Sequence, residues 1–149
     1  MANYILNTFW DWDPVCTVDM LREHKAAAYK NKEVIDEFKK DDVVFLYQNG
    51  VGIIAMGMVN SERKEKDYTY NGEFRPKEWM DCPRNGETRK NEEFYVELSN
   101  FTTFDKPIRH DNDIYKSEIK KELPIKKALY ELSDEKATVL LQILWRIKR

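Results

Sequence analysis

The clearest pattern in the chain is a pair of apolar stretches, residues 43–47 and 51–59, on either side of Asn49-Gly50. Asn-Gly readily adopts the positive φ angles of a type I′ turn, whose twist matches that of the strands it joins, so the pattern predicts a tight β-hairpin. Nearly every position in both arms is apolar, whereas a strand with one solvated face would alternate apolar and polar residues. The hairpin is therefore expected at the centre of a small barrel, with both faces covered and helices packed outside.

The remaining patterns predict two more strands and several helices. Strands are expected at residues 4–9 and 93–104, where apolar and β-branched residues gather. Helices are expected at residues 19–29, where Ala26-Ala27-Ala28 favours a helix, and at 33–38, 124–132 and from Ser133 onward. The buried stripe of the last helix is expected to consist of Leu140, Leu141, Leu144 and Trp145.

The stretch from Ser61 to Glu92 is polar and has no regular period. It is long for a loop in a compact domain, so it is expected to hold short extended pieces, such as Tyr68-Thr69-Tyr70, and to carry function. No internal repeat and no second domain are visible in the sequence. The prediction is a single α+β domain over residues 1–149, a mixed but mainly antiparallel β pseudobarrel flanked by helices.

Composition limits the functions that the chain can have. Hydrophobic residues make up 42% of the 149 residues and aromatic residues 13%, which is enough for a substantial core. The formal net charge is −2, so no overall field attracts the protein to nucleic acid or membrane, and binding must depend on a local pocket or patch. The first residues do not resemble a secretory signal and no apolar run reaches membrane-spanning length, so a soluble, cytoplasmic protein without a membrane partner is predicted.

Signals for catalysis are weak. His24 and His110 lie in different segments, and neither a G-x-S-x-G nor a P-loop motif is present. Cys16 and Cys82 are isolated, without partners at the spacing of metal ligands. No metal site, no cofactor and no catalytic residue are predicted.

Aromatic residues at the ends of predicted elements are the richer signal. They are accompanied by two amides, Asn7 at the end of the first strand and Gln48 at the hairpin tip. Aromatic rings at a barrel mouth can stack on a planar base, and amides can read its edge through paired donors and acceptors. Packing of the rings in the core or under a lid is the alternative for each of them. The candidate ligand-binding residues are Asn7, Trp10, Trp12, Tyr29, Tyr47, Gln48 and Trp79.

Basic residues are interleaved with aromatic ones between Arg63 and Lys90, a combination that suits phosphate contact beside base stacking. Acidic residues are equally frequent there, so a solvated loop is the alternative. The candidate phosphate contacts are Arg75, Lys77 and, after the long strand, Arg109.

The order of these segments resembles that of the EVE domain and, more distantly, of the YTH domain, both within the PUA-like superfamily. The resemblance spans nearly the whole chain and is carried best by the hairpin pattern D-x-V-x-F-L-Y…G-I-I-A-x-G-x-V, which begins at Asp41. The segments Asn7-Thr8-Phe9-Trp10, Phe94-Tyr95-Val96-Glu97-Leu98 and Leu132-Ser133-Asp134-Glu135 are also similar. The chain departs from the family in having Asp41 where glycine usually precedes the aspartate, and in the loop around Trp79.

This resemblance implies a pseudobarrel whose open end holds a flipped, often modified, nucleobase. The residues that it implies for the pocket are Asn7, Trp10, Tyr29, Tyr47, Gln48 and, by analogy with the loop aromatic of YTH domains, Trp79. The expected partner is DNA or RNA that carries a modified base.

Two other functions stay open. An enzyme similar to the ASCH branch of the superfamily would act on small nucleoside-like substrates, and it would need Lys25, Lys30 or Glu97 to face inward. A protein-interaction or inhibitor role would use the Ser61–Glu92 stretch as a docking loop.

Overall fold

The computed structural model describes residues 1–8, 20–28, 32–48, 51–67, 69–70, 73–74, 92–109 and 129–148. Its strands are β1 (Asn3–Asn7), β2 (Lys25–Ala28), β3 (Val43–Gln48), β4 (Gly52–Val59), β5 (Lys64–Asp67), β6 (Thr69–Tyr70), β7 (Glu73–Phe74), β8 (Glu92–Ile108) and β9 (Leu129–Leu132). Its helices are α2 (Lys32–Asp36) and α5 (Asp134–Lys148), and a single helical turn covers residues 20–23. Within these ranges no helix is both long enough and apolar enough to cross a membrane.

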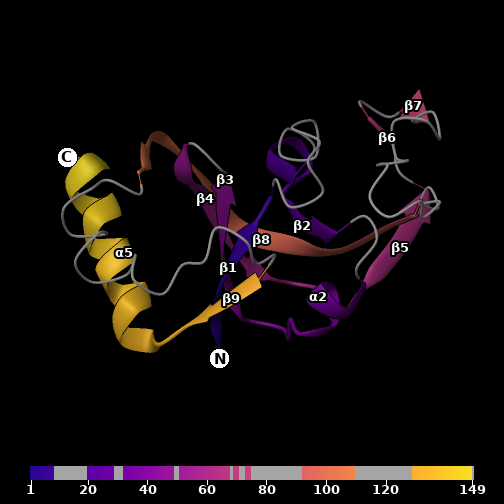
Figure 1. Cartoon of the computed structure of the whole chain (residues 1–149), viewed down its shortest axis with the longest axis horizontal. Helices are drawn as coiled ribbons and strands as arrows, with labels where there is room; N and C mark the ends of the chain where they lie inside the picture. The colour runs from indigo at the N-terminus through magenta and orange to yellow at the C-terminus, as the bar shows by residue number, and fades with distance from the viewer. Residues whose placement is uncertain are drawn as a thin grey trace, which may run out of the picture.

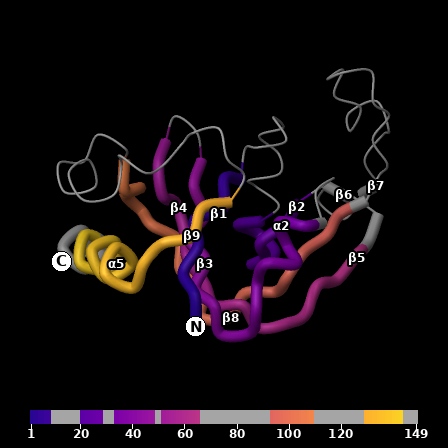
Figure 2. The backbone as a smooth tube through the Cα atoms, turned by 60° about the horizontal axis from the view of Figure 1, so that its bottom comes forward, coloured from indigo at the N-terminus to yellow at the C-terminus, as the bar shows by residue number. Residues whose placement is uncertain are grey.

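The described strands form one curled, seven-stranded sheet and a separate small ribbon. The order in the sheet is β2-β8-β4-β3-β1-β9, with β5 also paired to β8, and the ribbon consists of β6 and β7. The pairing of β1 with β3 is parallel, and the other pairings are antiparallel. Helix α5 lies on one side of the sheet, and α2 lies toward the other side (Figures 1 and 2). This is the mainly antiparallel α+β pseudobarrel that the sequence predicts.

The central hairpin is confirmed, and both of its faces are covered. Along β3, Val44 and Leu46 belong to one core, while Phe45 and Tyr47 belong to another. The alternation arises because successive strand residues point to opposite faces, so a continuous apolar run supplies two cores at once. The hairpin tip, Asn49-Gly50, lies outside the described residues, and its type I′ turn stays a prediction.

Each core lies on one face of the sheet. The first is enclosed by the curl and includes Met20, the alanines of β2, and Ile35 and Phe38 from the α2 region. The second lies between the sheet and α5, which contributes Ala137, Leu140 and Ile143. The expected buried stripe of α5 is therefore correct for Leu140 but wrong for Leu141, which is 42% exposed. The side chains of Leu144 and Trp145 lie outside the described part of the chain.

The turn that leads into β3 contains a left-handed residue before the buried aspartate. Asp41 adopts a φ of 73°, a left-handed conformation in which glycine has no steric penalty and aspartate is tolerated. The buried Asp42 carboxylate accepts hydrogen bonds from the backbone N–H of Ala2 and of Lys39, both at 2.8 Å. Asp42 thus ties the start of the chain to the entrance of the hairpin, which is a structural role.

The described ends of two predicted helices are strands instead, while residues 20–23 of the first are helical as predicted. Residues 25–28 pair with β8 as β2, because the small side chains of Ala26, Ala27 and Ala28 fit against the neighbouring strand and bury almost completely. Leu129–Leu132, expected at the end of a helix, pairs with β1 as β9. In both cases pairing with a distant strand overrides local helix propensity. The helix from Ser133 is confirmed, since the Ser133 hydroxyl accepts a hydrogen bond from the Lys136 N–H at 3.2 Å.

Strand β8 is longer than predicted and bends as it passes from one neighbour to the next. Its first part pairs with β2 and β5, and its second part with β4. The register against β4 shifts between Met56 and Met58, opposite Asn100, which has a φ of 50°. Such a bulge increases the local bend of a strand, and here it lets one strand serve both halves of the curled sheet.

Candidate functional site

Four of the candidate residues lie together at one edge of the sheet. Asn7 ends β1 and lies in register beside Tyr47 of β3. Both side chains are buried, and burial raises the pKa of the Tyr47 hydroxyl. The next residue, Thr8, donates hydrogen bonds to the Tyr47 carbonyl oxygen from its backbone N–H at 2.8 Å and from its hydroxyl at 3.0 Å. The ends of these two parallel strands are therefore held rigidly together.

Gly52 brings the other two candidates to the same edge. It pairs with the half-buried Gln48 across the hairpin, and it lies against the end of β8, where Arg109 follows. Gly52 has a φ of 123°, and a Cβ atom there would lie 2.2 Å from the Ile108 carbonyl oxygen. Only glycine permits this approach. Arg109 itself is exposed.

The candidate residues at this edge differ in how far they are buried. Tyr47 belongs to the core beneath α5, so its ring supports the edge from inside rather than offering a free stacking face. Gln48 and Arg109 are the more accessible groups. The other candidates lie outside the described residues, namely Trp10, Trp12, Tyr29, Arg75, Lys77 and Trp79.

A buried ion-pair cluster lies on β2 and β8. The ammonium group of Lys25 forms ion pairs with Glu93 and, at 2.6 Å, with Glu23, and it lies 5.3 Å from the centre of the Tyr95 ring. The side chains of Lys25 and Glu93 are 2% and 0% exposed, while Glu23 is 34% exposed and also faces Arg22 at 4.0 Å. Lys25 therefore faces inward, as the enzyme alternative requires.

The charge state of this lysine limits its chemistry. Burial is the largest influence and lowers the pKa of Lys25, but the charges of Glu93 and Glu23 and the hydrogen bonds that the ammonium group donates to them together outweigh it. The pKa of Lys25 is consequently raised, and the group is a fixed positive charge at neutral pH. A protonated amine is neither a general base nor a nucleophile.

Sequence reasoning did not identify Glu93 and placed Lys25 in a helix. The pairing depends on the β2–β8 register, which sets Lys25 opposite Glu97 and leaves it to extend past Ala27 toward Glu93. The only available signal was a lysine followed by three alanines, whose small side chains leave room for a long one on the same face.

A second ion pair occupies the same strand at the surface. Lys64 donates to Glu97 at 2.8 Å, and their side chains are 46% and 49% exposed. Glu97 thus does not face inward, and Lys30 lies outside the described residues.

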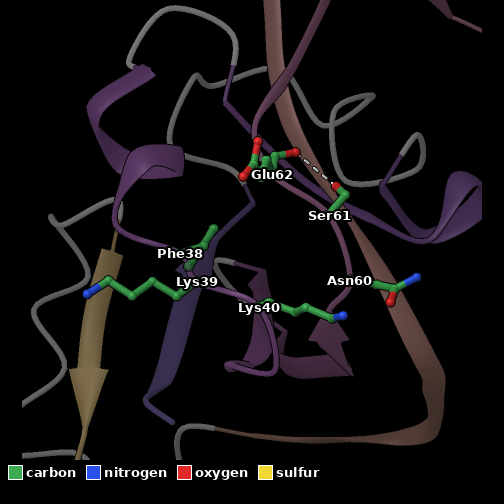
Figure 3. Close-up of a pocket in the computed structure, with 6 residues that line it drawn as sticks. All are labelled: Phe38, Lys39, Lys40, Asn60, Ser61 and Glu62. Carbon is green, nitrogen blue, oxygen red and sulfur yellow. Dashed lines mark hydrogen bonds between the residues drawn. The ribbon is translucent and has the colours of Figure 1, made fainter.

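An open cavity of about 490 Å³ lies at the other end of the hairpin (Figure 3). Its lining comes from the segment before β3 and the segment after β4: Phe38, Lys39, Lys40, Asn60, Ser61 and Glu62. The amino groups of Lys39 and Lys40 extend in opposite directions in Figure 3. They do not converge on one anion, and none of the predicted site residues lines this cavity.

The described residues contain no group of histidine, cysteine and acidic side chains that could hold a metal ion. His24 is exposed and stacks on Phe101, with ring centres 4.4 Å apart and an angle of 13° between the rings. His110 lies outside the described residues.

No protein-family model matches the sequence, and no curated protein matches it either. Solved structures share the fold over nearly its whole length. A hypothetical protein from Leishmania major has a TM-score of 0.56 at 11% identity, covering 100% of this chain and 98% of that one. A Pseudomonas putida protein has a TM-score of 0.55 at 13% identity, covering 95% of this chain and 99% of that one.

Human THYN1 in complex with DNA containing 5-methylcytosine is a third structure with this fold. Its TM-score is 0.51 at 10% identity, and the match covers 96% of this chain and 97% of that one. At identities this low, structural similarity establishes the fold alone, and that fold is the PUA-like pseudobarrel.

Proposed function

We propose that this chain is a non-catalytic module of the EVE type that binds DNA or RNA through a modified base. The proposal rests mainly on one observation: the fold extends end to end over that of THYN1, whose structure contains 5-methylcytosine DNA. The order of sequence segments, from Asn7 through the hairpin to the last helix, supports the same assignment. The base would be held at the edge formed by Asn7, Tyr47, Gln48 and Arg109.

The chemistry of that edge suits a base beside a phosphate. The Gln48 amide provides a donor and an acceptor in one plane, which matches the edge of a base. The Arg109 guanidinium is always charged and suits a flanking phosphate. Buried Tyr47 and the two Thr8 hydrogen bonds keep the strand ends fixed, so these groups are positioned before the ligand arrives.

A direct test is binding to matched oligonucleotides. Fluorescence anisotropy with single-stranded and duplex DNA and RNA, each with and without 5-methylcytosine, should show tighter binding to a modified member of the set. Gln48→Ala should weaken that binding roughly 2- to 12-fold, the value of one neutral hydrogen bond. Gln142→Ala, an exposed glutamine of α5, is the matched control and should bind as the wild type does. Absence of binding to every oligonucleotide would refute the proposal.

An ASCH-like enzyme is the second candidate, because Lys25 faces inward and is paired with buried Glu93. The raised pKa of Lys25 opposes this function, since it favours a fixed charge over a base. Incubation of the protein with modified nucleosides separates the two candidates. Turnover would favour the enzyme, and binding without turnover would favour the module. If the protein shows neither turnover nor binding, a protein partner of the Ser61–Glu92 stretch would be favoured.

A further inference from the structure

We infer that a bulge at the end of β8 turns Lys106 out of the sheet to contact the phosphate backbone of the bound nucleic acid. The inference rests on the proposed function and adds to it one residue and the group that it binds. That group is a phosphodiester beside the base, held by charge and without regard to sequence.

The last part of β8 contains more residues than its pairing with β4 requires. Thr103 lies opposite Ala55 in the ladder between the two strands. The following pair joins Ile108 to Ile53, so five steps along β8 match only two along β4. The three additional residues form a bulge, and the end of β8, in orange, curves at this place (Figures 1 and 2). Pro107 has no N–H to donate to a ladder and is tolerated here because the pairing is already interrupted.

Both ends of the bulge are fixed in the core beneath α5. Phe104 and Ile108 are 6% and 0% exposed and belong to this second core. Every second residue of an unbroken strand points to the same face, so Lys106 would then lie with these two side chains under α5. Lys106 is exposed instead. The bulge therefore changes the direction of one charged side chain, as bulges beside binding sites often do.

The ammonium group of Lys106 is available for a ligand. Among the residues that the structure describes, no carboxylate forms an ion pair with it, although Asp105 precedes it and is also exposed. Other cations of the sheet are engaged: Lys25 pairs with Glu93, and Lys64 pairs with Glu97. A phosphate that binds Lys106 thus displaces no ion pair of the described chain.

The bulge brings this charge to the proposed base site. Its far end, at Ile108, lies against Gly52, which pairs with Gln48 across the hairpin. Lys106 is two residues before Ile108, so the backbones of the two residues lie within about 7 Å of each other. The flexible four-carbon side chain of lysine extends this reach. The ammonium group can therefore contact a phosphate that flanks a base at Gln48.

The experiment measures the effect of salt, because a phosphate contact releases counterions and gives binding its salt dependence. Fluorescence anisotropy follows the wild type and Lys106→Gln on an oligonucleotide with 5-methylcytosine, between about 50 and 200 mM NaCl. The slope of log affinity against log salt should be less steep in the variant by about 0.7–0.9, the share of one phosphate. The ratio of the two dissociation constants should then shrink about threefold over this range. The unmodified oligonucleotide should show the same ratio, because a phosphate contact does not read the base.

Matched variants separate a local contact from a change in net charge or in folding. Lys40→Gln removes an exposed lysine at the opposite end of the hairpin and changes the net charge equally. It should keep the wild-type slope. Lys106→Arg keeps the charge and should keep both the affinity and the slope. Urea midpoints of all three variants should equal that of the wild type, because both lysines are exposed.

The outcomes distinguish this inference from the proposed function. If the wild type binds no oligonucleotide, the proposed function fails, and this inference with it. If the wild type binds but Lys106→Gln keeps its slope, or changes it no more than Lys40→Gln does, the inference is wrong and the proposed function stands. A loss of preference for the modified base, or a lower urea midpoint, would assign Lys106 to base contact or packing and would also contradict the inference. A less steep slope in Lys106→Gln alone, restored in Lys106→Arg, supports it.

Discussion

Strand β8 contributes the glutamates of two lysine–glutamate ion pairs that differ sharply in burial. Lys25–Glu93 is buried, with side chains 2% and 0% exposed, whereas Lys64–Glu97 is about half exposed. Both lysines have a raised pKa, the first against the effect of burial and the second through the hydrogen bond and charge of Glu97. The comparison shows that the same two charged groups can form an ion pair either in the interior or at the surface, where solvent changes its contribution.

At the surface, water and salt screen the charges, and such a pair contributes little. In the interior each charge depends on its partner, because an unpaired charge in a low dielectric is very unfavourable. The buried pair is thus a fixed part of the interior in which each charge needs the other, while the exposed pair is an ordinary feature of a solvated strand. The predictions below test this difference.

The largest effect is expected from breaking the buried pair on one side. Lys25→Met leaves the Glu93 carboxylate buried without its ammonium partner and should lower the free energy of unfolding by about 3–5 kcal/mol. Urea denaturation of the variant and the wild type measures this difference. A loss below about 1 kcal/mol, the range of exposed pairs, would show that the burial of the pair has no energetic consequence.

Removing both charges should restore most of that loss. The double variant Lys25→Met/Glu93→Met leaves no buried charge at this site, and its free energy of unfolding should lie within about 1 kcal/mol of the wild type or above it. The difference between the double and the single variant in the same urea experiment gives the coupling between the two residues. If the double variant is as unstable as Lys25→Met, the pair matters for its packing and not for its charge.

Alkaline pH should weaken the buried pair selectively. Because folding raises the pKa of Lys25, its contribution to stability is complete below its ordinary value of 10.5 and is lost as pH rises through the folded pKa. The stability advantage of the wild type over Lys25→Met should therefore shrink above about pH 10.5. Unfolding curves at pH 8 and pH 11 measure it, and an advantage that grows with pH would contradict the assignment.

The smallest effect is expected at the surface. Lys64→Met removes the exposed pair and should leave the urea midpoint unchanged within error, at low and at high salt, because solvent already screens these charges. A large loss of stability would show that the exposed pair of Lys64 and Glu97 contributes substantially to folding.

The sequence was sufficient where local pattern and final packing agree. The hairpin was predicted because its apolar runs indicate that both strands are buried and Asn49-Gly50 indicates where the chain turns between them. The start of α5 was predicted because Ser133 caps it. Local pattern misled at Ala26, Ala27 and Ala28, where high helix propensity gives way to pairing with β8.

The candidate site was predictable only in part. The ends of predicted strands identify Asn7, Tyr47 and Gln48, and the parallel pairing of β1 with β3 brings the first two into register. That pairing, like the meeting of Lys25 with Glu93, joins segments that are distant in sequence, and a single sequence contains no local sign of it. The predicted roles of Trp10, Trp12, Tyr29 and Trp79 remain predictions.

The most direct test of the central proposal is to map where an oligonucleotide binds. Backbone amide resonances of the ¹⁵N-labelled protein can be followed during titration with DNA containing 5-methylcytosine. The account predicts that the largest changes occur at the sheet edge around Asn7, Gln48, Gly52 and Arg109, with little change around Lys39, Lys40 and Asn60 at the opposite end of the hairpin. Changes that cluster at the opposite end, or no changes at all at saturating DNA, would contradict it.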